Sequence, residues 1–324
     1  MLIGIAAFKH KSINAYSKSG LYFDTIVSVT IYSDNAQNAE SLLAAAMDLC
    51  AEYEKLFSDS IDTSDIHNIN ISRGQSTLVS PDTIKLLNKG LYYSELTDGR
   101  FDITIAPVTK LWDFHGTENK IPDNSTISAA LKNVDYQNLQ IDETGCTVTL
   151  KNIDSRIEIG SLAKGYIADI IGDYLEKGGI QGAIINMGGD MKLIGKSNSN
   201  NYFTIGVNDP NSSGKALFPV YLSNMAIATS GTYERSFLGD DGRLYHHIID
   251  TNTGYPCDSD LVQATVICPD SVDADSLATI CILYKKSEAL SFIESLPDTE
   301  AALVDLSGSI SYTSGMEKYL TIPK

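Results

Sequence analysis

The segment from residue 158 to residue 190, EIGSLAKGYIADIIGDYLEKGGIQGAIINMGGD, restricts the folds open to this chain more than any other. A short apolar run ends at Gly160, and from about Ser161 onward apolar residues recur at helical spacing: Leu162, Tyr166, Ile170 and Tyr174. Gly178 and Gly179 then interrupt the pattern, as glycine often does just past the end of a helix. The segment therefore predicts a strand, a tight glycine turn and a helix.

The start of this helix is a natural place for a phosphate group, because a helix that opens at a glycine turn presents unpaired N–H groups and a partial positive charge. A second strand, over residues 183–187, leads into Gly188, Gly189 and Asp190. Two glycines let a backbone approach a ligand closely, and the acid can accept from a hydroxyl or hold a neighbouring loop. A glycine turn alone more often marks a plain strand–helix–strand unit, so this segment needs partners elsewhere.

The charge balance limits the partners of the protein. Of 324 residues, 41 are acidic and 24 are basic, which gives a formal net charge of -17. Binding to duplex nucleic acid needs clustered Lys and Arg, so we expect no nucleic-acid partner. A phosphorylated ligand would have to be held by local dipoles, one or two basic side chains and a divalent cation, because the overall field repels it.

The length allows one large domain or two closely packed ones. We predict an α+β fold, a single compact body of mixed sheets flanked by helices, with two lobes around a ligand cleft as the alternative. The five cysteines lack the spacing of a metal site, so we interpret them as mostly buried small hydrophobic residues. The sequence has no run of about 18 apolar residues that could span a membrane.

Residues 2–8, LIGIAAF, are too short for a signal peptide but are similar to the end of a bacterial lipoprotein signal, with Phe8 in place of the lipidated cysteine. One hypothesis is therefore that the native protein is a membrane-anchored lipoprotein that works outside the cytoplasm. An arbitrary first strand or a vector-derived leader explains the same residues equally well. We assign residues 1–19 to an N-terminal leader or tether and residues 20–324 to the main domain.

Local patterns predict the remaining elements. Period-two alternation over residues 22–32 predicts a half-buried strand that carries on one face Phe23, Thr25, Val27, Val29 and Ile31. Helices are predicted to begin at Asp34-Asn35 and after caps at Ser64 and Ser80, and another covers residues 287–296. Hairpins are expected at residues 139–150 and 301–313, and single strands at residues 202–207 and 226–229.

Two constellations near the C-terminus have the chemistry of a catalytic site. His246 and His247 are adjacent on a predicted strand, where successive side chains point to opposite faces, so at most one is expected to act as a base. Asp275 and Thr279 are four residues apart, so on a helix both can offer oxygen atoms to one Mg²⁺ ion. Taken alone, a histidine that only packs and an acid that only stabilises a helix dipole are the simpler explanations.

Six motifs occur in the order found in one known family: Phe101-Asp102-Ile103-Thr104 with Pro107; Gly160 with Ala163-Lys164-Gly165-Tyr166; Asn186 with Gly188-Gly189-Asp190; Ser230-Gly231 with Tyr233-Glu234-Arg235; His247-Ile248-Ile249-Asp250 with Thr253-Gly254; and Asp275 with Leu277-Ala278-Thr279. From about residue 20 to its end, the chain resembles the ApbE family of FAD:protein FMN transferases, once described as thiamine-biosynthesis lipoproteins. The resemblance implies a Mg²⁺-dependent enzyme that cleaves the diphosphate of FAD, releases AMP and attaches FMN through a phosphoester to a Thr or Ser of a target protein. Such targets are typically flavoprotein subunits of membrane redox complexes.

The resemblance also implies roles for individual residues. His247 would be the base that deprotonates the acceptor hydroxyl. The metal would be bound by Asp275, Thr279 and the backbone carbonyl of Ser161, with a carbonyl near Ala278 as a further candidate. FAD would contact a set of residues that lie far apart in the sequence: Arg100, Phe101, Asp102, Glu158, Lys164 and the backbone of Ile248.

Two positions depart from the family pattern. Glu158 stands where Asp is usual, which shifts the carboxylate, and Phe23 stands where Met is usual in the wall of the adenine pocket. Neither change removes a metal ligand. Two alternatives to the transferase stay open at this point: a Mg²⁺-dependent FAD pyrophosphatase that uses water as the acceptor, and a non-catalytic flavin-binding lipoprotein.

Overall fold

The computed structural model describes residues 13–114, 119–197, 199–212 and 214–323. At its centre is a sheet of eight strands in which all neighbouring pairs are antiparallel, in the order β1-β2-β6-β7-β10-β13-β14-β15. The strands are β1 (Asn14–Tyr22), β2 (Thr25–Ser33), β6 (Gly182–Met187), β7 (Asp190–Gly195), β10 (Met225–Gly231), β13 (Leu261–Cys268), β14 (Glu300–Asp305) and β15 (Ile310–Tyr312).

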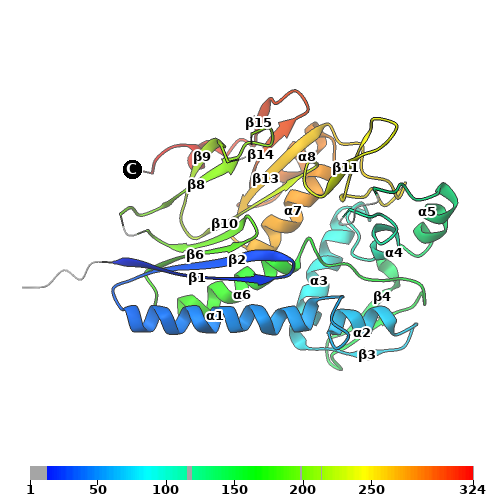
Figure 1. The fold of residues 1–324 in the computed structure, drawn as a ribbon, viewed down its shortest axis with the longest axis horizontal. Coiled ribbons are helices and arrows are strands. Elements are labelled where there is room, and N and C mark those ends of the chain that lie inside the picture. The colour runs from blue at the N-terminus through cyan, green and yellow to red at the C-terminus, as the bar shows by residue number, and fades with distance from the viewer. Residues whose placement is uncertain (1–12, 115–118, 198, 213, 324) are drawn as a thin grey trace, which may run out of the picture.

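Helices cover one face of this sheet. Helix α1 (Ala36–Phe57) packs on β1 and β2, α6 (Ala163–Lys177) packs on β6 and β7, and α7 (Ser271–Leu283) packs on β10 and β13. Figure 1 shows α1 and α6 along the same face, with α7 next to α6. Strand β2 shows why this face is apolar: alternate residues Val27, Val29 and Ile31 are fully buried against the helices. Helix α8 (Lys286–Glu294) packs on β14 beyond α7.

The opposite face is covered by a two-stranded sheet of β8 (Phe203–Asn208) and β9 (Ala216–Leu222), with α9 (Glu317–Leu320) beside it. A second apolar cluster joins Val207 and Val220 of this small sheet to Leu193, Ile227 and Ile267 of the large one. In β10, Ile227 faces this cluster while Ala226 and Ala228 face the helices. The central strands are therefore buried on both sides.

A smaller region lies at one end of the large sheet, at the right of Figure 1. It consists of α2 (Asp65–Ile71), α3 (Pro81–Leu96), α4 (Ala106–Thr109), α5 (Asn124–Leu131), a 3₁₀ turn (Tyr136–Asn138) and the sheet β3-β5-β4, formed by β3 (Thr77–Leu78), β4 (Leu139–Asp142) and β5 (Thr147–Leu150). In a hairpin of β11 (Ser236–Leu238) and β12 (Leu244–His246), the Tyr245 ring stacks on Trp112 of this region and the Phe237 ring packs against Tyr245 and Phe114. One apolar core runs from β2 through Ile69 to Val148, so the chain is one body and not two lobes with separate cores.

Much of the local structure agrees with the sequence. The fold is α+β, and the caps predicted at Ser64 and Ser80 each accept a hydrogen bond from a backbone N–H of the first turn, as does Asn35 at the start of α1. Both predicted hairpins form, as β4–β5 and β14–β15. All five cysteines are free, and four of them are buried. Among the described residues, no helix has the length and apolar character needed to cross a membrane.

The N-terminal strand differs from the prediction. Phe23 and Asp24 have left-handed φ values of 52° and 56° and form the turn between β1 and β2, so Phe23 is not part of β2. Strand β1 was not predicted, because most of its residues are exposed and give no alternating apolar signal. The expected leader, residues 1–19, overlaps β1 from Asn14 onward, and the lipoprotein-like residues 2–8 lie outside the described part of the chain.

Helix α6 also differs from the prediction in three ways. It begins at Ala163 rather than Ser161, and the extended residues before it form no strand of a sheet. Of the predicted apolar stripe, Leu162 is buried and Tyr166 and Ile170 pack against the core, but Tyr174 is 40% exposed. The buried face also contains Ala163, Gly165, Ile167, Ala168, Ile171, Gly172 and Leu175. Small residues on this face bring the helix close to its neighbours.

Candidate active site

The candidate site is built where the first turn of α6 meets α7. A Cβ atom on Gly165 would lie 2.3 Å from the carbonyl oxygen of Ser271, so only glycine permits this contact between backbones. The N–H of Gly165 donates to Oδ2 of Asp275 at 3.3 Å. The close approach therefore sets the α6 residue Lys164 beside the α7 residue Asp275.

Lys164 links two carboxylates that come from distant parts of the chain. Its Nζ lies 3.0 Å from both carboxylate oxygens of Asp275 and 3.4 Å from Oδ2 of Asp190. Asp190 is the first residue of β7. It follows Gly188 and Gly189, which form a two-residue loop between β6 and β7 with φ values of 73° and 120°. Asp190 also accepts from the N–H of Thr229 at 3.1 Å. The acid after the two glycines thus holds a neighbouring strand, where the sequence suggested a hydroxyl or a neighbouring loop as its partner.

The cluster carries more negative than positive charge. Asp190 and Asp275 are both buried and share the single ammonium group of Lys164. Burial raises the pKa of Asp190 to about 7, and the negative charge of Asp275 adds to the shift while Lys164 opposes it. Burial acts against the charge of Lys164, but the two carboxylates outweigh it and raise the pKa of the ammonium group. Such a cluster favours a further cation.

The oxygen atoms next to this cluster fit a hard divalent cation. Thr279, one turn after Asp275 on α7, has its Oγ1 3.3 Å from the Asp275 carbonyl oxygen and 3.2 Å from Oγ of Ser230. The carbonyl of Ser161 accepts from Oγ of Ser276 at 3.3 Å, so it too lies at the junction of α6 and α7. Carboxylate, hydroxyl and carbonyl oxygens are the ligands that Mg²⁺ takes. The donor set therefore fits the metal that the resemblance implies.

Two observations limit this candidate metal site. Ala278 is fully buried within α7. In a helix, a backbone carbonyl accepts from the N–H four residues later, so the carbonyl of Ala278 is already used by the helix itself. Within the described ranges, no group of three or more His, Cys, Asp or Glu side chains could hold a metal ion. A metal at the junction would therefore need the hydroxyl and carbonyl oxygens as well as the carboxylates.

The two adjacent histidines have different surroundings. His246 is buried, with Nε2 3.2 Å from the carbonyl oxygen of Cys257 and Nδ1 accepting from the N–H of Ile248 at 3.4 Å, so both ring nitrogens have protein partners. His247, just after β12, has Nδ1 3.1 Å from the carbonyl oxygen of Glu234. This contact assigns the proton to Nδ1 and leaves Nε2 of His247 as the acceptor. Of the two, His247 is the one equipped to act as a base.

His247 is uncharged at neutral pH. Burial, together with the positive charge of Arg235, lowers its pKa to about 4. Lys164 contributes in the same direction. An unprotonated imidazole with a fixed tautomer can accept a proton from a hydroxyl.

Glu158 accepts a hydrogen bond from the hydroxyl of Thr109. Its side chain is partly open to solvent, but the surrounding protein raises the pKa of the carboxyl. The hydrogen bond from Thr109 and the positive charges of Lys110 and Arg235 oppose this rise in pKa. The N–H of Glu158 donates to the carbonyl of Ile103 at 2.8 Å, which fixes the segment before α6 against the Phe101–Thr104 motif. A carboxylate both solvated and surrounded is placed to accept from a ligand.

The structure does not bring the side chains of residues 100–102 to this cluster. Phe101 is buried against the ring of Tyr93. Asp102 is buried, and it accepts from the N–H and hydroxyl of Thr104, both at 2.7 Å, and from the N–H of Tyr136 at 2.9 Å. Burial raises the pKa of Asp102 in spite of these hydrogen bonds. Its carboxylate therefore holds a turn and has little capacity left for a ligand.

Arg100 and Ile248 are also occupied by protein partners. Arg100 forms an ion pair with Glu288 of α8 at 2.9 Å and lies over the ring of Tyr284. The carbonyl of buried Ile248 accepts from the N–H of Cys257 at 2.9 Å. In the protein without ligand, these groups are engaged in the fold, and their predicted contacts with FAD stay predictions.

Three residues of the cluster were absent from the predicted site. Asp190 was recognised only as the acid after a glycine pair, and nothing local in the sequence places it beside Asp275. Glu234 and Arg235 were noted only as part of a motif. Burial raises the pKa of Glu234, against the positive charges of Lys164 and Arg235. Their signal was the Tyr233-Glu234-Arg235 run that precedes the histidine strand.

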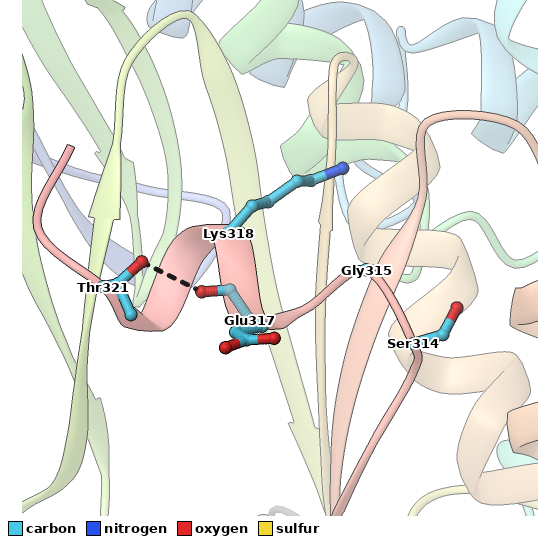
Figure 2. A pocket seen from close by; sticks show the side chains of 5 residues that line it. All are labelled: Ser314, Gly315, Glu317, Lys318 and Thr321. Carbon is cyan, nitrogen blue, oxygen red and sulfur yellow. Dashed lines mark hydrogen bonds between the residues drawn. The ribbon is translucent and has the colours of Figure 1, made fainter. Parts of the chain in front are cut away.

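A surface hollow of about 430 Å³ lies elsewhere, near the C-terminus. Figure 2 shows the residues that line it: Ser314, Gly315, Glu317, Lys318 and Thr321. None of them belongs to the cluster around Lys164, and the Thr321 hydroxyl is already bonded to the carbonyl of Glu317 at 3.3 Å. We do not assign this hollow to the candidate site.

Comparisons with known proteins agree with the motif order. The sequence model of the ApbE family matches residues 23–304. The chain is 32% identical over 303 residues to a protein of Klebsiella pneumoniae named FAD:protein FMN transferase, with 92% of each chain covered. A protein of the same name from Treponema pallidum is 27% identical over 308 residues, covering 90% of this chain and 85% of its own.

Solved structures share the fold. The ApbE protein of Thermotoga maritima superposes with a TM-score of 0.88 at 28% identity, covering 95% of this chain and all of that one. The flavin transferase ApbE of Vibrio cholerae gives a TM-score of 0.85 at 22% identity, again with 95% of this chain and 100% of that chain covered. At that identity the second comparison shows the fold alone.

Proposed function

The chain belongs to the ApbE family and is an enzyme of the kind its relatives are named for, and we propose that it transfers FMN from FAD to a Thr or Ser hydroxyl of a target flavoprotein and releases AMP. One observation supports this proposal most: His247 is an uncharged imidazole with Nε2 as its acceptor, in the same site as a negatively charged oxygen cluster. A protein that only bound flavin would have no use for such a base.

The proposed reaction is a substitution at phosphorus. The acceptor hydroxyl oxygen forms a bond to the phosphorus on the FMN side of FAD, and the bond between that phosphorus and the bridging oxygen breaks. The bridging oxygen leaves with AMP. The hydroxyl proton passes to Nε2 of His247, while the hydrogen bond from Nδ1 to Glu234 keeps the imidazole in the correct tautomer.

Asp275, Thr279 and the carbonyl of Ser161 would hold Mg²⁺ in this site, with Asp190 as an additional nearby carboxylate. When bound, Mg²⁺ would neutralise the diphosphate and stabilise the charge that develops during transfer. Lys164 fixes the orientation of Asp275 through contacts to both carboxylate oxygens. Glu158, whose carboxylate is partly solvated, would accept a hydrogen bond from FAD.

The target and the cellular location are further parts of the proposal. By the family resemblance, the partner is a flavoprotein subunit of a membrane redox complex that carries the acceptor Thr or Ser. A lipid anchor and a place outside the cytoplasm rest on the sequence of residues 2–8 alone. Fractionation of cells expressing the native gene would test this part, since a protein found only in the cytoplasm would contradict it.

Release of AMP from FAD, measured with and without an acceptor protein and with Mg²⁺ or EDTA, tests the proposal. We expect AMP only when both Mg²⁺ and acceptor are present. Equal AMP release without acceptor would instead establish a FAD pyrophosphatase, and the absence of AMP with tight FAD binding would establish a flavin-binding protein.

A further inference from the structure

Arg235 lies in a turn that also positions His247. The residue before it, Glu234, accepts the hydrogen bond from Nδ1 of His247, and the residue after it begins β11. The φ value of Arg235 is 43°, in the left-handed region that residues other than glycine rarely adopt. Hydrogen bonds on both sides hold the turn: Tyr233 donates from its hydroxyl to Gln263 at 3.0 Å, and Ser236 donates to the carbonyl of Tyr233 at 3.1 Å.

The charge of Arg235 is unpaired, unlike those of the two other basic residues of the site. Lys164 forms ion pairs with Asp275 and Asp190, and Lys110 forms one with Asp59. The exposed guanidinium of Arg235 makes no ion pair or hydrogen bond with any residue that the structure describes. Its partner is therefore to be sought outside the chain.

Backbone contacts place Arg235 beside His247. The carbonyl of Glu234, the residue before Arg235, lies 3.1 Å from Nδ1 of His247, and Ser236, the residue after it, pairs with His246 across the hairpin. The positive charge of Arg235 lowers the pKa of His247 and opposes the raised pKa of Glu158. The turn therefore presents this positive charge beside the proposed base. A guanidinium presents a planar fork of N–H donors, which matches two phosphate oxygens at once.

Because the protein as a whole is negatively charged, an anionic ligand needs an unpaired basic side chain such as Arg235 in the site. With a net charge of -17, the chain as a whole repels a diphosphate, and Lys164 is already neutralised by two carboxylates. We propose that Arg235 is a further ligand-binding residue, whose guanidinium pairs with the diphosphate of FAD beside His247. This inference rests on the proposed function, since it takes FAD to be the ligand of the site.

Binding affinities for three probes test the inference: FAD, ADP and riboflavin, measured by calorimetry in the presence of Mg²⁺. ADP carries the diphosphate without the flavin, and riboflavin carries the flavin without phosphate. For Arg235→Gln we expect the Kd of FAD and of ADP to rise about 10- to 100-fold, the range for loss of one charge-assisted contact, with the Kd of riboflavin unchanged. Arg235→Lys should give a smaller rise, because it keeps the charge but loses the fork.

Arg243→Gln is the matched control. Arg243 is exposed in the loop of the same β11–β12 hairpin, and its backbone carbonyl accepts from Gly239 at 2.9 Å. Its replacement removes an equal charge from the same hairpin and is expected to leave all three Kd values within about twofold of the wild type. A comparable loss in Arg243→Gln would show that only the overall charge matters, and would overturn the inference.

The pH dependence of transfer supplies a second readout that a merely structural role would not change. The charged and titratable groups that influence His247 are Arg235, Lys164 and His246, and Glu234 accepts its hydrogen bond. Removing the charge of Arg235 should move the acidic limb of the rate profile to higher pH, because a nearby positive charge disfavours the protonated imidazole.

Outcomes that contradict the inference differ from those that contradict the proposed function. If Arg235→Gln binds FAD and ADP as the wild type does, Arg235 is not a diphosphate ligand, whatever the enzyme's activity. If riboflavin binding weakens as much as FAD binding, the substitution has damaged the pocket and the inference also fails. If the wild type binds FAD but transfers nothing to any acceptor, the proposed function fails while the binding result for Arg235 still stands.

Discussion

Replacing Gly165 with alanine tests whether the close contact of α6 and α7 builds the site. The new Cβ would lie 2.3 Å from the carbonyl oxygen of Ser271 and 2.6 Å from the Cα of Val272, and both are backbone atoms that cannot rotate away. An ordinary contact needs 3.4 Å or more. The two helices must therefore move apart by about 1 Å, which is the scale of displacement that costs about 100-fold in rate at a catalytic site.

Gly165→Ala loses stability through overpacking and gains some through the higher helix propensity of alanine. Overpacking of this kind costs about 1–3 kcal/mol, while the change from glycine to alanine inside a helix contributes up to about 1 kcal/mol. A net loss of about 2 kcal/mol corresponds to a fall of about 3 °C in Tm for a chain of this length. The contacts of Lys164 with Asp275, now 3.0 Å, would lengthen with the separation of the helices.

Gly172→Ala is the matched control on the same helix. Its Cβ would meet only side-chain atoms, Cδ1 of Ile194 at 3.3 Å and Cγ of Lys192 at 3.5 Å, so the neighbours can adjust. We expect its Tm to be unchanged or raised and its Mg²⁺-dependent transfer rate to match that of the wild type. The assay is calorimetric melting together with AMP release in the presence of acceptor. A wild-type rate in Gly165→Ala would refute the view that the contact between α6 and α7 positions the cluster.

Three further predictions concern single residues. Asp275→Ala is expected to abolish Mg²⁺-dependent turnover, measured as AMP release, and near-normal rates would contradict its role at the metal. His247→Ala should slow transfer by about 100-fold or more while the Kd of FAD changes little, because general-base catalysis contributes to that extent; an unchanged rate would exclude it as the base. His246→Ala should instead lower the free energy of unfolding by about 2–3 kcal/mol through the loss of two buried hydrogen bonds, and urea unfolding checks this. Burial lowers the pKa of His246 to about 4 from 6.5, so the unfolded chain binds more protons between these values. The contribution of neutral His246 to the free energy of unfolding, about 3 kcal/mol, is then complete above pH 6.5 and is lost as the pH falls through 4. If the urea midpoint of the wild type does not decrease when the pH is lowered from 7 to 4, this prediction is wrong.

Local elements with strong end signals could be predicted from the sequence. Asn35, Ser64 and Ser80 each place a side-chain oxygen before an apolar helical pattern, and their cap hydrogen bonds depend on only three neighbouring residues. Strand β2 was recognisable because its buried residues alternate with less buried ones. Such signals are contained within one element and need no knowledge of the rest of the fold.

The buried face of α6 could not be predicted in the same way. Apolar spacing favoured Tyr166, Ile170 and Tyr174, but the helix buries a face that includes Gly165, Ala168 and Gly172. Small residues give no hydrophobic signal, although they decide how closely two helices approach. The choice of face depends on β6, β7 and α7, which are distant in the sequence.

The candidate site likewise combines contacts that one element determines with contacts that only the whole fold creates. The spacing of Asp275 and Thr279 places both on one turn of α7, as predicted, because the two residues share one helix. The contacts of Lys164 with Asp275 and Asp190 join three separate elements, and only the fold brings them together. The hydrogen bonds of the Asp102 carboxylate with Thr104 and Tyr136 could not be read from its motif, and the predicted contact of this segment with FAD stays a prediction.

Intact-mass spectrometry of an acceptor flavoprotein domain, incubated with the enzyme, FAD and Mg²⁺, tests the central claim most directly. The account predicts a mass gain equal to FMN less one water for each acceptor molecule, matched by one AMP, absent with EDTA and gained much more slowly with His247→Ala. AMP released at the full wild-type rate while the acceptor keeps its original mass would contradict the account.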